Sequence, residues 1–170
     1  MASWGTPPIH VTGDTLAVSD WNTIANNETF LYQAPYGFYY NSSGTSCGIG
    51  TTQVTLGGTT ASGYSFSVSS NNAVVPIAGI YTALFAVQMT SGAGSGTNNI
   101  QALVYQNGSL TLAGSAVPTY TEAPASSGGG CVKCAASATL GLYLCNATTS
   151  LTTCANAANT FLHAFWVGST

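Results

Sequence analysis

Hydrophobic and polar residues alternate with a period of two along much of the chain after residue 35. GYSFSVSS (63–70) sets aromatic and aliphatic residues against serines, and ATLGLYLCN (138–146) places a leucine at every second position. This period is typical of strands with one buried face. NTFLHAFWVG (159–168) predicts a final apolar strand. No segment after residue 35 shows a convincing helical period, so we expect a domain made of short strands.

The most apolar stretch is VVPIAGIYTALFAVQMT, residues 74–90. It contains Pro76 and Gly79, and its uninterrupted apolar part is shorter than the roughly 18 residues that a membrane-spanning helix needs. Its β-branched and aromatic residues favour a strand. We therefore predict a long central strand over residues 79–89, buried on both faces or nearly so. Pro76 lies just before it, where a missing amide donor is tolerated.

Two further segments have characteristic turn residues. Asn107-Gly108 separates NIQALVYQ from SLTLAG, which is the strongest short-range signal for a β-hairpin. VPTYTEAPASSGGGCVKCAAS (117–137) holds prolines, serines and a glycine triplet, and these predict an irregular exposed loop. Tyr120 and Glu122 are the candidate binding residues of this loop.

Residues 1–35 differ from the remainder and predict an extended leader followed by one short amphipathic helix. Ser19 or Asp20 is the expected N-cap, and Pro35 ends the element. We expect a docking arm over residues 1–35 and a β-sandwich domain over residues 36–170. The candidate docking residues are Trp4, Pro7, Pro8, Ile9, Trp21, Ile24, Phe30 and Leu31.

Charge is nearly absent from this chain of 170 residues, which has one Lys or Arg and four Asp or Glu. Lys133 is the only lysine, and the chain has no arginine. The protein therefore cannot neutralise several phosphates, and nucleic acid is excluded as a direct partner. The same scarcity argues against a polybasic membrane anchor. MASWGTPPIH has neither a basic residue nor an apolar run, so we expect no secretory signal. A surface of such low charge does little to oppose self-association.

Five cysteines offer candidate chemistry. Cys131-Val-Lys-Cys134, together with Cys145 and Cys154, has half the spacing of a four-thiolate zinc site. The second pair, however, is separated by eight residues and flanks a predicted hairpin. A disulfide between Cys145 and Cys154 is therefore preferred to a metal, with free thiols as the remaining alternative. Cys47 is unpaired in every scheme, and we expect no metal or cofactor.

Catalytic constellations are also missing from the sequence. His10 and His163 are far apart, and we expect His163 to be a packed histidine with one hydrogen bond. Three of the four carboxylates lie in the leader and Glu122 stands alone, so a two-carboxylate hydrolytic site cannot be built within the domain. The abundant serines lack a base and an orienting acid. We therefore expect that the protein is not an enzyme.

Four phrases follow one another in a characteristic order: PIAGIYTALFAV, LVYQNGSL, ATLGLYLC and FLHAFWVG. The order resembles the jelly roll shared by the complement-recognition heads and the tumour-necrosis-factor family, over roughly residues 45–170. After Leu144 the sequence departs from that pattern, because CNATTSLTTC stands where a Gly-Asp turn is usual. The residues that carry the resemblance are Pro76, Gly79, Tyr81, Asn107, Gly108, Leu142, Leu144, Phe161, Phe165 and Val167.

This resemblance implies an all-β, antiparallel jelly-roll sandwich. In the family, three copies pack around an axis through aromatic inner faces, so a homotrimer is implied here. Phe165 and Trp166 must point to opposite faces of their strand, one to the core and one to an interface or the outer surface. The residues implied for the trimer interface and core are Tyr81, Tyr105, Phe161, Phe165 and Trp166.

The leader, TPPIHVTGDTLAVSDWNTIANNETFLYQAP, is similar to the opening of many structural proteins of tailed bacteriophages. The matching residues are Thr6, Pro7, Thr12, Gly13, Asp14, Asn22 and Thr23. Combined with the jelly roll, the similarity implies a trimeric capsid decoration or cement protein on the outer surface of a virion. Its partners would then be the major capsid protein or other virion proteins. The alternative is a receptor-binding module of a tail fibre or baseplate tip that holds a glycan or protein through the 117–137 loop.

Overall fold

The computed structural model describes residues 5–6, 9, 17–63, 66–91, 99–119, 123–146 and 151–169. The chain divides into two compact units, Met1–Ala34 and Pro35–Thr170. This division falls one residue before the boundary expected from the sequence. Among the described residues, no helix is long and apolar enough to cross a membrane.

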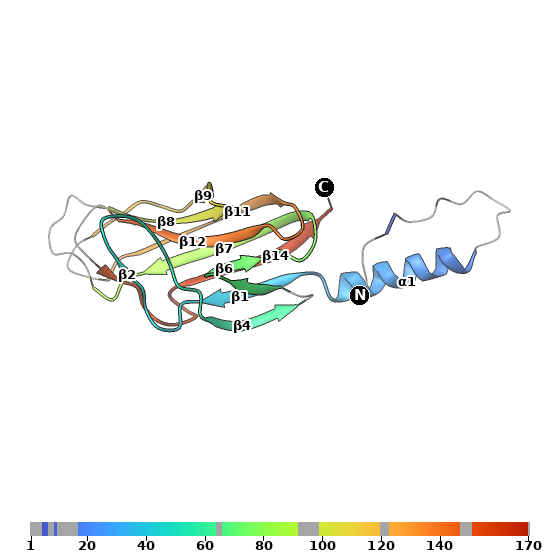
Figure 1. The fold of residues 1–170 in the computed structure, drawn as a ribbon, viewed down its shortest axis with the longest axis horizontal. Helices are drawn as coiled ribbons and strands as arrows, with labels where there is room; N and C mark the ends of the chain where they lie inside the picture. The colour runs from blue at the N-terminus through green and yellow to red at the C-terminus, as the bar shows by residue number, and fades with distance from the viewer. Residues whose placement is uncertain are drawn as a thin grey trace. The chain divides into compact units, whose positions relative to one another are not determined.

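The first unit contains the helix α1 (Val18–Tyr32), drawn in blue in Figure 1. Its N-cap is Ala17, not Ser19 or Asp20 as predicted. Asp20 instead lies at the third helical position, where its Oδ2 accepts a hydrogen bond from the Ala17 N–H at 2.8 Å. This is the reciprocal half of a capping box, and it satisfies the backbone donor of the N-cap without any cap side chain.

The leader is attached to the middle of α1 through Asn27. The Gly5 N–H donates to Asn27 Oδ1 at 2.7 Å, and Asn27 Nδ2 donates to the Gly5 carbonyl at 2.9 Å. Asn27 is buried, and this pair of bonds satisfies its amide. Trp4, Pro7 and Pro8 lie outside the described residues.

The second unit is a β-sandwich whose strands run along the length of the domain (Figure 1). No described residue of this unit is α-helical, in agreement with the sequence pattern. Its strands are β1 (Tyr36–Tyr40), β2 (Ser46–Cys47), β3 (Gly50–Gln53), β4 (Gly58–Gly63), β5 (Ser67–Ser69), β6 (Asn72–Val74), β7 (Gly79–Gln88), β8 (Asn99–Gln106), β9 (Ser109–Ala113), β10 (Val117–Pro118), β11 (Ala125–Cys134), β12 (Thr139–Asn146), β13 (Leu151–Thr152) and β14 (Phe161–Gly168).

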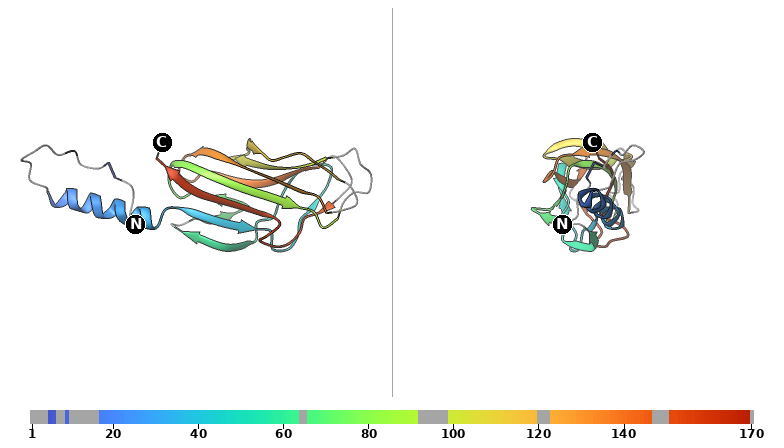
Figure 2. Two further views of the ribbon diagram at one scale, coloured as in Figure 1. Left: turned by 180° about the vertical axis from the view of Figure 1, so that it is seen from behind. Right: turned by 90° about the vertical axis from the view of Figure 1, so that its right-hand side faces the viewer.

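The strands form two large sheets and one small one, and every pairing is antiparallel. The five-stranded sheet has the order β11-β7-β14-β1-β4, and Figure 2 shows β7, β14 and β1 side by side in yellow-green, red and blue. The seven-stranded sheet has the order β10-β8-β12-β6-β5, with β3 paired to β12 and β9 paired to β8. β13 pairs with β2. The core is filled by side chains from the inner faces of both large sheets.

Several predicted strands are confirmed. β8 and β9 form the predicted hairpin, in which Asn107 and Gly108 have φ values of 49° and 79°, the positive pair that a type I′ turn requires. β12 and β14 also lie where the alternation places them. Of the GYSFSVSS segment, Gly63 ends β4 and Ser67–Ser69 form β5, whereas Tyr64 lies outside the described residues.

β7 is the predicted central strand, but its burial differs from the prediction. Alternate residues from Gly79 to Val87 are buried, whereas those between them reach the outer face, where Leu84 is 43% exposed. The expectation of two buried faces was therefore wrong. A sheet in a sandwich packs against its partner on one side only, and the apolar residues on the other side of β7 need a different explanation.

β11 replaces most of the loop predicted over residues 117–137. It pairs with β7 along its full length of ten residues. A Cβ atom added at Gly128 would lie 2.7 Å from the Phe85 ring, and one added at Gly129 would lie 2.7 Å from the Leu84 side chain. The glycines thus allow side chains of β7 to lie across the neighbouring strand, so the triplet reflects close packing and not a turn.

The first and last strands of the domain along the chain, β1 and β14, are neighbours in the five-stranded sheet. β1 pairs with β14 over its whole length. The Trp166 N–H donates to the Pro35 carbonyl at 2.8 Å, which extends this pairing to the residue where the domain begins. The start of the domain and the end of β14 are thereby held side by side.

Candidate interaction surface

The outer face of the five-stranded sheet is formed largely by aromatic residues. In β1, YGFYY, the buried residues are Gly37 and Tyr39, so Tyr36, Phe38 and Tyr40 point outward. The register places each of them opposite a residue of β14: Tyr36 faces Phe165, Phe38 faces His163, and Tyr40 faces Phe161. Cross-strand aromatic pairs of this kind stabilise a sheet. We call the outward residues of these strands, with two from β7, the aromatic face: Tyr36, Phe38, Tyr40, Ile80, Leu84, Phe161, His163 and Phe165.

Four rings of the aromatic face, those of Phe161, Phe38, His163 and Phe165, form a continuous row. Phe38 stacks on Phe161 with ring centroids 5.3 Å apart and meets His163 edge-on at 5.4 Å. His163 in turn lies 5.3 Å from Phe165. The rings are only partly buried, and Tyr36 and Leu84 are more exposed than the other members of the face. Because contiguous apolar surface that reaches the solvent is characteristic of contact sites, this face is the candidate interaction surface of the domain.

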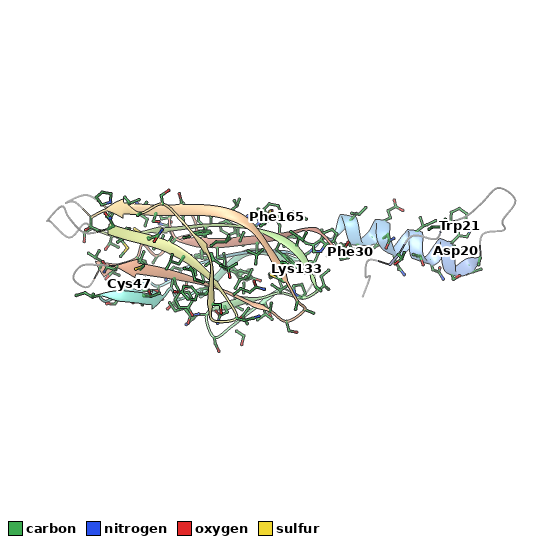
Figure 3. All side chains as sticks on the ribbon, turned by 90° about the horizontal axis from the view of Figure 1, so that it is seen from above. Asp20, Trp21, Phe30, Cys47, Lys133 and Phe165 are labelled. Atoms are coloured by element: carbon green, nitrogen blue, oxygen red, sulfur yellow. The ribbon has the colours of Figure 1, made fainter. Side chains whose placement is uncertain are left out.

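Charge is almost absent from this surface. Lys133 of β11 is the only charged side chain among the described residues of the domain, and it lies opposite Ile80 at one end of the face. Figure 3 shows Lys133 and Phe165 toward the same end of the domain, with Cys47 at the other. Burial lowers the pKa of His163 below its usual value, because the partly dehydrated site penalises the charged ring. The face is therefore neutral and apolar at neutral pH.

The residues implied for the interface and core do not share one surface. Phe161 and Phe165 lie on the aromatic face. Tyr81 is fully buried in the core, where its hydroxyl donates to the Ile77 carbonyl at 3.0 Å. Trp166 packs against the core, so Phe165 and Trp166 do point in opposite directions. Tyr105 lies on the seven-stranded sheet, where its ring centroid is 4.5 Å from that of Tyr143.

Most of the aromatic face was missed by the sequence reasoning. Tyr36, Phe38 and Tyr40 were assigned no role, because YGFYY is aromatic at four of its five positions and has no apolar–polar alternation that would separate its two faces. Leu84 was assigned to a strand with two buried faces. His163 was expected to be a packed histidine, and it does pack between Phe38 and Phe165.

The cysteines do not form the predicted disulfide, and all five are free thiols. The expected hairpin between Cys145 and Cys154 is not formed, because β12 pairs with β3, β6 and β8 whereas β13 pairs with β2. The Cys154 thiol donates to the Met89 carbonyl at 3.3 Å. The geometric basis for the disulfide is thus removed.

The alternative zinc ligands are also separated. Cys131 and Cys134 lie on opposite faces of β11, since Cys131 is exposed and Cys134 is buried. Within the described residues, no three His, Cys, Asp or Glu side chains are grouped as metal ligands would be. Burial raises the pKa of Cys47 and of Cys134 to about 11, which keeps both thiols protonated at neutral pH.

The arm presents a second apolar surface on α1. Trp21 is 58% exposed, and Ile24 and Leu31 are also exposed, at helical spacings that place the three on one side of the helix. Trp21 projects from the helix in Figure 3. Phe30, by contrast, is fully buried and is not available for docking, which corrects that part of the prediction. Tyr120 and Glu122, the predicted loop residues, lie outside the described residues.

No family model and no curated protein matches this sequence. Solved structures are similar to it in their fold. Murine APRIL at pH 5.0 matches with a TM-score of 0.64 and 13% identity, over 79% of this chain and 100% of that chain. The Eiger TNF of S. frugiperda matches with a TM-score of 0.59 and 9% identity, over 81% of this chain and 95% of that chain.

The fold is a jelly roll. The fold class expected from the sequence is thereby confirmed. The strands pack as two facing sheets, with β1, β4, β7, β11 and β14 in one and β3, β5, β6, β8, β9, β10 and β12 in the other. At these identities the likeness concerns the fold, and function must be argued from the surfaces of this chain.

Proposed function

We propose that this protein is a non-enzymatic structural protein that assembles into a homotrimer through its aromatic face. The observation that carries the proposal is the uncharged row of half-buried rings on β1 and β14. A soluble monomer would leave this row in contact with water, whereas a second copy would remove it at a gain of about 25 cal/mol per Å² of apolar surface. Aromatic residues are also those that interfaces favour over other surfaces.

A trimer is proposed because of the jelly-roll fold. The sequence resembles a family in which three copies pack around an axis, and the fold agrees with that resemblance. The aromatic face lies on one sheet and is uncharged, so no repulsion between like charges opposes bringing three copies of it together. A heterologous contact that closes after three copies buries the face of every copy.

The arm is proposed to attach the trimer to a larger assembly, the outer surface of a tailed-bacteriophage capsid, as a decoration or cement protein. Support comes from the leader sequence and from the exposed stripe of Trp21, Ile24 and Leu31. Three arms on one trimer would bind neighbouring capsomers together, so the buried area opposes the outward pressure of packaged DNA. Avidity among the three arms multiplies a modest single contact.

The trimer is tested by the oligomeric state of the purified chain. We expect sedimentation equilibrium at pH 7.5 to give three times the chain mass of 17.2 kDa. The mass should not fall on dilution to micromolar concentrations, and moderate salt should have little effect because the face carries almost no charge. A monomer at tens of micromolar would contradict the proposal.

Removing the arm should abolish capsid binding while leaving a folded trimer. The deletion should end at Ala34, since the Pro35 carbonyl accepts the hydrogen bond from Trp166. Co-sedimentation with capsids stripped of this protein measures the binding. Trp21→Ser with Ile24→Ser in the full chain should weaken it at least about tenfold, the effect of losing roughly 1.4 kcal/mol of contact. Asn22→Ser with Asn26→Ser, at exposed polar positions of the same helix, is the matched control, and equal loss in both pairs would contradict the docking role.

A further inference from the structure

His163 occupies the centre of the aromatic face. Its strand, β14, is the middle strand of the five-stranded sheet. The register places Leu84 of β7 on one side of it and Phe38 of β1 on the other. Along β14, Phe165 lies 5.3 Å away, ring to ring. The imidazole is therefore surrounded by apolar side chains in the plane of the face.

No carboxylate faces His163 from any of the strands around it. The titratable groups on the outer face are the hydroxyls of Tyr36 and Tyr40 on β1 and the Cys131 thiol and Lys133 amine on β11. β7 contributes none, and neither do the described side chains of β4. Of these groups Lys133 is the charged one, and it has the same sign as a protonated histidine. An imidazolium at this position would have no counter-ion on the face.

We infer that the trimer is an acid-reversible assembly in which protonation of His163 separates the copies. The inference rests on the proposed trimer and adds a means of regulating the same surface. Contact with a second copy would remove the remaining water from the three imidazoles, so that the assembled state accepts only their neutral form. Mild acid then favours the separated copies, in which each ring keeps its partial contact with water and can take up a proton.

The direction of the effect follows from proton linkage. The pKa of His163 is already below its usual value of 6.5 because of burial, and burial in an interface moves it in the same direction. A separated copy therefore binds protons at a pH where the trimer does not. The affinity is unaffected above the pKa of His163 in the separated copy, which lies below 6.5, and falls as the pH decreases through that pKa, by up to about three decades per pH unit for three histidines.

The composition makes the effect measurable. The chain has two histidines and four carboxylates, and His10 is the only other imidazole. No carboxylate side chain belongs to the described part of the domain. A dissociation between pH 7 and 5.3 therefore has few sources within the chain, and this range stays above the isoelectric point of about 4.7.

The test is the dissociation constant of the trimer, measured by sedimentation velocity at steps between pH 7.5 and 5.3 for the full chain and for His163→Gln. The wild-type chain should lose affinity progressively toward pH 5.3, by at least about tenfold in total, as the protons linked to dissociation are taken up. His163→Gln should show a slope near zero, whatever its affinity at pH 7.5. His10→Gln should retain the wild-type slope. His163→Phe, which is aromatic and cannot be protonated, provides a second variant if the glutamine variant assembles too weakly to measure.

Two outcomes would overturn the inference while leaving the trimer intact. In one, the wild-type trimer persists unchanged to pH 5.3. In the other, the His163 variants lose affinity with the same slope as the wild type. A chain that is already monomeric at pH 7.5 would instead refute the proposed trimer itself, so the two failures are distinguishable.

Discussion

Phe38→Lys is expected to convert the proposed trimer into a folded monomer. Phe38 is the ring that contacts both Phe161 and His163, so the substitution would place three ammonium groups in an interface without a carboxylate. An unpaired buried charge costs several kcal/mol, and affinity should fall by at least about a thousandfold. Lysine is preferable to aspartate, because a carboxylate opposite His163 could pair with the protonated imidazole. Sedimentation velocity measures the mass, and circular dichroism reports whether the fold is retained.

Ile49→Lys is the matched control for this experiment. Ile49 lies between β2 and β3 and is 76% exposed. Its substitution likewise replaces an apolar side chain by one that ends in an ammonium group, but at a position outside the aromatic face. This variant should remain trimeric. If both variants dissociate, the added charge alone is responsible; if neither does, the aromatic face is not the interface.

Phe85→Ala is expected to lower the free energy of unfolding by about 3–5 kcal/mol, the usual cost of truncating a buried phenylalanine. Phe85 is almost fully buried on the inner face of β7. The effect is best measured by urea unfolding in the Phe38→Lys monomer, because assembly would otherwise contribute to the apparent stability.

The adjacent residue Leu84 provides the comparison, since it lies on the other face of the same strand. In the monomer, Leu84→Ala should cost less than about 1 kcal/mol, as expected for a partly exposed position. In the wild-type chain it should weaken the trimer. If the two alanine variants destabilise the monomer equally, the division of β7 into a core face and an assembly face is incorrect.

Local signals predicted the elements that depend on local chemistry. Asn107-Gly108 specified the β8–β9 hairpin because few residues other than asparagine and glycine adopt its positive φ angles. The leucines of β12 specified a strand because they alternate, and all three are fully buried. The class of fold followed from repeating such signals along the domain.

Features that depend on packing between distant segments were not accessible in the same way. The glycines of β11 have the composition of a loop, and only the approach of Phe85 and Leu84 from β7 explains them. Ala17 is a poor N-cap by propensity, and the Asp20 carboxylate compensates from the third helical position. In both cases the propensity of the residue itself gives the wrong prediction, because a side chain elsewhere in the structure determines its conformation.

The candidate site shows a related limit. Alternation along a strand separates its residues into two sets, but it does not state which set faces the core. Tyr81 and Phe161 are both aromatic residues of predicted strands, yet the first is buried and the second lies outside. That assignment depends on which sheet covers which face, and it emerged only from the register of β1, β7 and β14.

The hydrogen bond between Trp166 and the Pro35 carbonyl has a practical consequence for engineering. Because the domain begins and ends at neighbouring points, a short linker could join the two and new termini could be opened at the Asn107-Gly108 turn. Such a circular permutant would keep every strand pairing of the five-stranded sheet. It would also place a fused cargo on the β8–β9 hairpin of the seven-stranded sheet, away from the aromatic face of the five-stranded sheet.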